Sequence, residues 1–197
     1  MAVIRAFIAL DLSSEISQRL DQISSDLKKR MPPNGVRWVP AKNIHLTLKF
    51  LGDVSTANLE SLQKMIQVES EKVPPFDISV GSVGAFPNVR RPRVVWVGVT
   101  ALQALPALQH NIETSANRLG YPPEDRPFSP HLTLGRVNRN ISPADLQYVG
   151  QALSGYNIGF IGAVHLTEVH LYRSDLSPQG AHYTRLYSAP LKQQAVP

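Results

Sequence analysis

One tetrapeptide that occurs twice carries the residue types best suited to chemistry. The sequence His-Leu-Thr-Leu occupies residues 45–48 and, 86 residues later, residues 131–134. In an extended strand, side chains two positions apart share a face. Each copy is therefore predicted to present its histidine and threonine to one side and to bury its two leucines on the other.

The two histidines, His45 and His131, are suited to paired proton transfer. Imidazole titrates near neutral pH, so two opposed rings can supply one general base and one general acid together. The hydroxyl groups of Thr47 and Thr133 lie beside them in the pattern and can hold a phosphoryl oxygen. This chemistry requires no metal ion, and we expect no metal or other cofactor.

The bare His-x-Thr pattern is not specific, because four of the six histidines have a threonine two residues later. His45 and His131 differ from His165 and His182 in having an apolar residue after the threonine and a glycine nearby. We interpret His165 and His182 as polar strand positions. His110 is predicted to lie on the surface of a helix.

A metal site at residues 165–170 is the alternative for the remaining histidines. His165, Glu168 and His170 are ligand types found together in facial triads. Positions 165 and 170 differ by five, so strand alternation places them on opposite faces and argues against ligation. The sequence also lacks a Gly-rich phosphate loop, a His-Glu-x-x-His motif and a nucleophile-elbow serine.

Composition excludes several classes of protein. The chain has 197 residues, is 43% hydrophobic and contains no cysteine, which excludes disulfides, thiol catalysis and iron–sulfur ligation. No apolar run is long enough for a membrane span, and we expect residues 3–10 to be a first strand, not a signal peptide. We expect a cytoplasmic location and no contact with a membrane. The net charge of +5 favours a phosphate-bearing partner.

Hydrophobic periodicity predicts two β–α–β units that succeed each other. From His45 the next helix begins 10 residues later and the next strand 31 residues later; from His131 the offsets are 11 and 29. Helix starts are marked by Ser13 or Ser14, by Ser55 or Thr56, and by Ser142 before a proline. The predicted strands cover residues 3–10, 36–50, 76–83, 93–100, 131–137 and 160–172. No linker separates independent domains, so residues 1–197 are predicted to form one domain of two similar lobes.

The motifs, taken in order, resemble those of the two-histidine (2H) phosphoesterase superfamily, and specifically its RNA 2′,3′-cyclic phosphodiesterases, formerly called 2′-5′ RNA ligases. The resemblance covers nearly the whole chain. The matching segments are residues 5–10, 36–40, 43–52, 84–87, 93–96, 128–136 and 171–174.

The resemblance implies an α+β fold of two lobes related by a pseudo-twofold axis. Each lobe would be a small, mainly antiparallel sheet with helices on its outer face, and the active site would lie in the central cleft. By the same resemblance, His45 is the proton donor and His131 the proton acceptor, while Thr47, Thr133 and Arg136 bind the phosphate. The spacing of the residues does not itself assign the acid and the base.

Arg136 conflicts with simple alternation, because a residue five positions after His131 falls on the opposite face of a strand. Gly135 is therefore predicted to mark a bulge or strand end that turns Arg136 toward the cleft. The corresponding residue of the first copy is Phe50. We expect Phe50 to pack in the core, with a substrate-facing position as the alternative.

The implied reaction is hydrolysis of RNA 2′,3′-cyclic phosphate ends to 2′-phosphomonoesters by metal-independent acid–base catalysis, with reversible 2′-5′ RNA ligation as a second reaction at the same site. The implied partner is RNA with such a terminus, and we expect a monomer. Two alternatives stay open: a non-catalytic module that binds RNA ends, and a 2H phosphodiesterase for another cyclic or 2′-5′ linked nucleotide. Candidate RNA contacts flank the motifs: Arg37, Trp38, Lys42, Arg90, Arg91, Arg93, Arg126 and Arg139.

Overall fold

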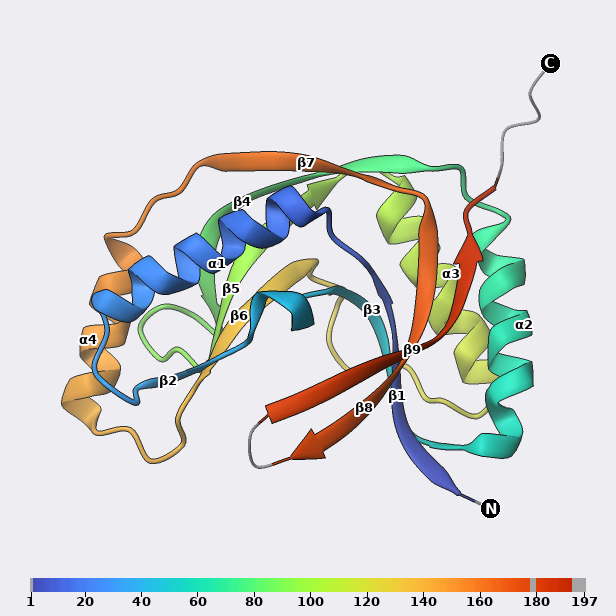
Figure 1. Cartoon of the computed structure of the whole chain (residues 1–197), viewed down its shortest axis with the longest axis horizontal. Coiled ribbons are helices and arrows are strands. Elements are labelled where there is room, and N and C mark those ends of the chain that lie inside the picture. Colours follow the sequence, from blue (N-terminus) through green and yellow to red (C-terminus); the bar gives the residue numbers. More distant parts are fainter. Residues whose placement is uncertain (1, 178–179, 193–197) are drawn as a thin grey trace.

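The computed structural model describes residues 2–177 and 180–192, and within them four α-helices and nine strands (Figure 1). The helices are α1 (Ser14–Lys29), α2 (Leu59–Ser70), α3 (Ala104–Arg118) and α4 (Pro143–Ser154). The strands are β1 (Val3–Leu10), β2 (Val36–Trp38), β3 (Leu46–Ser55), β4 (Phe76–Phe86), β5 (Val94–Ala101), β6 (His131–Val137), β7 (Phe160–Leu166), β8 (Glu168–Ser177) and β9 (Gly180–Pro190). Two short 3₁₀ turns, Ala41–Asn43 and Thr56–Asn58, precede β3 and α2.

The helices begin where the sequence supplies a capping side chain. Ser13 accepts a hydrogen bond from the backbone N–H of Ile16, and Ser142 accepts one from that of Asp145, directly before Pro143. The third predicted start differs slightly, because Ser55 caps the short turn that leads into α2. On α1, an apolar stripe that includes Ile16, Leu20 and Leu27 is buried, which fixes the face that packs on the sheet.

The strands form one sheet whose order is symmetric about its centre. The order is β7-β4-β5-β6-β3-β1-β8-β9, every pairing is antiparallel, and β2 pairs with β6 outside this path. Among the described residues, the strand pairing between the halves β7-β4-β5-β6 and β3-β1-β8-β9 consists of the pair Leu46 and Leu132. The predicted α+β fold of two similar, mainly antiparallel lobes is confirmed.

Each lobe contains strands from both halves of the chain. β4 follows α2 in the sequence but pairs with β5 and β7, whereas β8 follows α4 and pairs with β1 and β9. The helices contact the sheet in pairs, α1 and α4 on one lobe and α2 and α3 on the other, on opposite sides of the view in Figure 1. One continuous cluster of buried apolar side chains connects the two lobes. This exchange of strands ties the position of one lobe to that of the other.

No helix in the described part of the chain is long and apolar enough to cross a bilayer.

Candidate active site

The two tetrapeptides lie side by side at the junction of the lobes. Leu46 and Leu132 are paired across β3 and β6, and both are fully buried. Because the strands are antiparallel, the residues on either side of this pair point to the same face, with His45 next to Thr133 and Thr47 next to His131. The predicted faces are confirmed, since the leucines are in the core and the histidines and threonines are partly exposed.

A cavity of about 430 Å³ lies over this junction. Its lining includes all five predicted site residues: His45, Thr47, His131, Thr133 and Arg136. The structure thus brings together two imidazoles, two hydroxyl groups and one guanidinium, although they come from segments 86 residues apart. This central cleft is lined by imidazoles that can transfer protons and by side chains that can donate hydrogen bonds to an anion.

Arg136 reaches the cleft because β6 contains a bulge. Trp96 pairs with Thr133 and Val95 with Gly135, so Leu134 is an extra residue on β6. Leu134 and Gly135 are both buried, and the next side chain, that of Arg136, returns to the cleft face. The predicted bulge is therefore confirmed.

The same bulge occurs in β3 and corrects the prediction for Phe50. Ala9 pairs with Thr47 and Ile8 with Lys49, so Leu48 is the extra residue. Phe50 consequently lies on the cleft face, where it lines the cavity and is 58% exposed. The expectation that Phe50 packs in the core is wrong, because the bulge predicted for the second copy is present in the first copy as well.

Both histidines are held by the same backbone contact. The Nδ1 of His45 is 3.0 Å from the carbonyl oxygen of Asn43, and that of His131 is 2.7 Å from that of Ser129. A carbonyl only accepts hydrogen bonds, so Nδ1–H is the donor in each case. Nε2 is then the nitrogen of each ring that is available for exchange of a proton with a substrate.

Each histidine also packs against an aromatic ring that lies 41 residues after the histidine of the opposite copy. The ring of His45 lies 4.7 Å from that of Tyr172, which follows His131 by 41 residues, and the ring of His131 lies 4.8 Å from that of Phe86, which follows His45 by the same number. Tyr172 is on β8 and Phe86 is on β4, the two exchanged strands. The exchange therefore completes the packing of both histidines.

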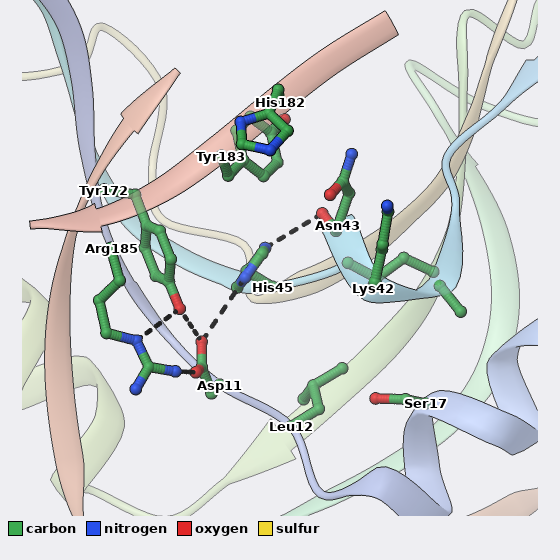
Figure 2. A pocket seen from close by; sticks show the side chains of 12 residues that line it. Asp11, Leu12, Ser17, Lys42, Asn43, His45, Tyr172, His182, Tyr183 and Arg185 are labelled. Atoms are coloured by element: carbon green, nitrogen blue, oxygen red, sulfur yellow. Dashed lines mark hydrogen bonds and ion pairs between the residues drawn. The ribbon is translucent and has the colours of Figure 1, made fainter. Parts of the chain in front are cut away.

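Beyond these shared contacts, His45 lies next to a network of polar side chains that was not predicted from the sequence. Asp11 Oδ1 lies 3.6 Å from His45 Nε2 and accepts a hydrogen bond of 2.7 Å from the Tyr172 hydroxyl group. Arg185 donates to Oδ2 of the same carboxylate, and His170 Nε2 lies 3.6 Å from that oxygen. Figure 2 shows His45 between Asn43 and Asp11 in a second cavity, of about 340 Å³. A sequence signal for Tyr172 is its spacing, because it follows His131 by the same 41 residues by which Phe86 follows His45.

The two histidines differ in the charges near them. Burial lowers the pKa of His45, and Asp11 and the Asn43 carbonyl partly offset this effect, while Arg185 adds to it. Burial also lowers the pKa of His131; here the Ser129 carbonyl raises it, Arg136 lowers it, and the charge of Glu124 raises it by less than either.

Tyr172 stays a hydrogen-bond donor at neutral pH. Burial and the hydrogen bond to Asp11 raise the pKa of Tyr172 to about 12. Its hydroxyl group therefore keeps its proton and holds the Asp11 carboxylate beside His45.

His110, His165 and His182 lie where they were predicted, whereas His170 does not. His110 is exposed on α3, and His165 is exposed on β7 beside Asp77. His170 is buried on β8. The single strand predicted over residues 160–172 is wrong, because β7 ends at Leu166 and β8 begins at Glu168 in the other lobe, so His165 and His170 lie on different strands. His182 is an exposed residue of β9 that also borders the cavity behind His45. Among the described residues, no three His, Asp or Glu side chains gather in a way that would hold a metal ion.

The candidate RNA contacts separate into groups. Arg37 and Trp38 line a groove of about 520 Å³ beside the cleft, Arg126 lines the cleft itself, and Lys42 borders the cavity behind His45. The other four predicted contacts line none of these cavities: Arg90, Arg91, Arg93 and Arg139.

Known proteins resemble this chain over most of its length. An RNA 2′,3′-cyclic phosphodiesterase of Methanothermobacter thermautotrophicus is 34% identical over 181 residues, which are 92% of this chain and 95% of the relative. One of Escherichia coli is 32% identical over 193 residues, 98% of this chain and 96% of the relative.

Solved structures are also similar to this chain over nearly its whole length. The crystal structure of E. coli LigT complexed with 3′-AMP has a TM-score of 0.74 at 29% identity, and that of TT0787 of Thermus thermophilus has 0.81 at 25%; both comparisons cover 98% of this chain and 100% of the other. The family described as LigT like Phosphoesterase matches the chain twice, over residues 10–96 and 97–183, so each match contains one His-Leu-Thr-Leu copy. The chain therefore belongs to the LigT-like phosphoesterases, the two-histidine family that its repeated motif predicted.

Proposed function

We propose that this chain hydrolyses RNA 2′,3′-cyclic phosphate ends to 2′-phosphomonoesters. The observation that carries the proposal is the single cleft lined by both histidines, both threonines and Arg136. Relatives that are 32% and 34% identical over more than nine-tenths of the chain are named RNA 2′,3′-cyclic phosphodiesterases, which supports this choice of substrate.

The step is an in-line displacement at phosphorus. A water oxygen attacks the phosphorus atom, the bond from phosphorus to O3′ breaks, and the phosphate stays on O2′. His131 Nε2 takes the proton from the attacking water, and His45 Nε2 gives a proton to the departing O3′. After one turnover, His45 has lost a proton and His131 has gained one. The pair must therefore exchange protons with solvent before the next turnover.

The asymmetry around the two rings supports His45 as the acid. Asp11 lies 3.6 Å from Nε2 of His45, so its carboxylate stabilises the imidazolium form of that ring. At 3.6 Å the contact is longer than a hydrogen bond, and the Nε2 proton is therefore not committed to Asp11. His131 has Arg136 as its stronger neighbouring charge, which disfavours the protonated form before the reaction and suits a base.

Thr47, Thr133 and Arg136 would stabilise the charge that develops on the phosphoryl oxygens. The hydroxyl groups flank the two histidines, and the exposed side chain of Arg136 lines the same cavity. Donors fixed where negative charge grows lower the barrier without reorganisation during the step, and a guanidinium forms charge-assisted bonds to phosphate. Each proton transfer is assigned to a side chain, so we expect turnover in the presence of a chelator.

The test is incubation with a 2′,3′-cyclic-phosphate oligoribonucleotide in chelator, followed by determination of the position of the product phosphate. We expect a 2′-phosphate and a free 3′-hydroxyl group. Tight binding without hydrolysis would support a module that binds RNA ends, and preference for another substrate in a panel of cyclic and 2′-5′ linked nucleotides would reassign the specificity. Addition of a 5′-hydroxyl RNA at high concentration measures 2′-5′ ligation, in which the 5′-hydroxyl oxygen replaces water as the attacking group and O3′ again departs.

The organisation of the protein is part of the same proposal. We propose that residues 1–197 act as one domain, because residues of both lobes line the same cleft. We also propose that the chain is a monomer and that it is located in the cytoplasm. Sedimentation of the full chain at micromolar concentration tests the oligomeric state, and localisation of a tagged chain tests the compartment.

A further inference from the structure

A groove of about 520 Å³ leads away from the cleft on the side of His45. It runs between β2 and the β8–β9 hairpin, which lie in the lower half of Figure 1. Phe50 and Arg136 line both the groove and the cleft, so the two are continuous. The acid–base step does not use the rest of this surface.

The groove is lined by positively charged side chains and by no acidic one among the described residues. Arg5, Arg37 and Arg136 line it, and among the described residues around it there is no aspartate or glutamate. Arg37 and Arg136 are direct partners across β2 and β6, an arrangement of like charges that destabilises a sheet unless an anion lies between them. Asp53 lies opposite Arg5 in the register but does not line the groove.

The opposite end of the cleft has a different character. Glu113 and Glu124 line it together with Arg126, and the Glu113 carboxylate is already paired with Lys49 at 2.8 Å. A phosphate backbone that left the cleft on this side would pass two carboxylates. Charge complementarity therefore favours the arginine groove for a polyanionic chain.

The direction of the reaction gives an independent argument. O3′ belongs to the nucleoside and leaves toward the acid, so the ribose must lie at the His45 end of the cleft. Phe7 and Tyr183 pack against the ring of His45, with centroids at 6.1 Å and 5.6 Å, and both also line the groove. The chain attached to that ribose therefore starts at the mouth of the groove.

We infer that the RNA strand 5′ to the terminal nucleotide lies in this groove, with its phosphates near Arg37 and Arg5 and with Trp38 as a surface on which a base can stack. The inference rests on the proposed function, because the acid role of His45 sets the direction. The His131 end then admits only the nucleophile, which is water in hydrolysis.

The experiment compares a short and a long substrate in one set of variants. KM and kcat are measured for 2′,3′-cyclic AMP and for a pentaribonucleotide that ends in a 2′,3′-cyclic phosphate, with wild type, Arg5→Ala/Arg37→Ala and the control Arg126→Ala. For the double variant we expect KM of the pentanucleotide to rise about tenfold, while kcat and both constants for the mononucleotide stay within about twofold. The Arg126→Ala control should leave the preference for the longer substrate unchanged.

Binding measurements separate the failure of this inference from the failure of the proposed function. The Kd of a fluorescent pentanucleotide with a 2′-phosphate end is measured at several salt concentrations and needs no turnover. We expect the double variant to bind more weakly and its dependence of log Kd on log salt to flatten by about 0.7 per lost contact. Equal effects on both substrates, or a loss confined to Arg126→Ala, would overturn the inference.

Discussion

The two lobes hold their histidines alike on one side of the ring and differently on the other. In both, Nδ1 donates to a carbonyl two residues earlier and an aromatic ring from an exchanged strand covers the imidazole. Of the two rings, only that of His45 has a carboxylate in direct contact within the described part of the chain: Asp11, which Tyr172 and Arg185 hold in place. We infer that duplication supplies two equivalent bases and that one added carboxylate makes one of them an acid.

The residue after the first tetrapeptide and its counterpart after the second show a similar contrast. Lys49 is 1% exposed and extends to Glu113, whereas the equivalent Gly135 lies against β2. A Cβ atom at Gly135 would come within 2.6 Å of Val36 Cγ1 and 3.1 Å of the Arg37 carbonyl oxygen. The same bulge is therefore packed by a buried ion pair in one lobe and by the approach of a strand in the other.

The largest expected effect comes from removing either ring. His45→Ala and His131→Ala should each lower kcat on a 2′,3′-cyclic-phosphate oligonucleotide about a hundredfold or more, because each removes one of two required proton transfers. Steady-state assays with Thr184→Ala, an exposed position on β9, as the control measure this loss. Near-full turnover by both histidine variants would eliminate the acid–base mechanism.

Replacement of the buried cation tests the contrast between Lys49 and Gly135. Lys49→Met should destabilise the fold by about 2 kcal/mol, since the Glu113 carboxylate and the Pro122 carbonyl lose their donor while Glu113 keeps some exposure. Urea unfolding gives the value, and Lys49→Met/Glu113→Leu should recover most of it. An unchanged midpoint in the single variant would show that the pair does not stabilise this lobe.

Removal of the carboxylate tests the difference between the two histidines. Asp11→Asn should lower kcat/KM about tenfold at pH 8, because the imidazolium form of His45 loses its stabilising charge. The control is Asp175→Asn, a part-exposed aspartate paired with Arg173 on the same lobe. A loss of the same size in the control would mean that the effect is general to the surface charge of the lobe.

Tyr172→Phe makes the aromatic partner of His45 match that of His131. The ring contact is retained, and the hydroxyl group that donates to Asp11 and accepts from Arg185 Nε is lost, so we expect a decrease in kcat of about threefold. The matched control is Phe86→Tyr in the other lobe, which should leave kcat within about twofold because the ring of His131 has no counterpart of Asp11 in direct contact among the described residues. Stopped assays at one pH distinguish these outcomes, and a hundredfold loss in Tyr172→Phe would instead give the hydroxyl a direct role.

The smallest effect concerns stability in mild acid. Burial lowers the pKa of His45, His131 and His170 below the ordinary value of 6.5. Between the folded and unfolded pKa values the unfolded chain binds more protons, so stability is fully present above pH 6.5 and decreases as the pH falls below it. Urea midpoints at about pH 7.5 and about pH 5.5 should show this decrease, and His170→Asn should reduce it. A rise in stability on acidification would contradict the burial of neutral rings.

Local sequence signals predict much of this fold. The features that they do not predict depend on contacts between residues far apart in the chain. The predicted strands at residues 3–10 and 131–137 and the caps Ser13 and Ser142 are confirmed, because periodicity and capping act within a few residues. The exchange of β4 and β8 and the approach of Asp11 to His45 depend on pairings across the whole chain, which no local pattern encodes. The prediction for Phe50 is wrong because one extra residue in a strand reverses the alternation.

The pH dependence of kcat/KM in wild type and Asp11→Asn tests the central claim most directly. If His45 is the acid and Asp11 acts on it alone, the alkaline limb of the bell should move to lower pH in the variant while the acidic limb, set by His131, stays in place. Movement of the acidic limb instead would contradict the assignment of roles, and a wild-type profile that is flat between about pH 5 and about pH 9 would contradict paired catalysis by the two histidines.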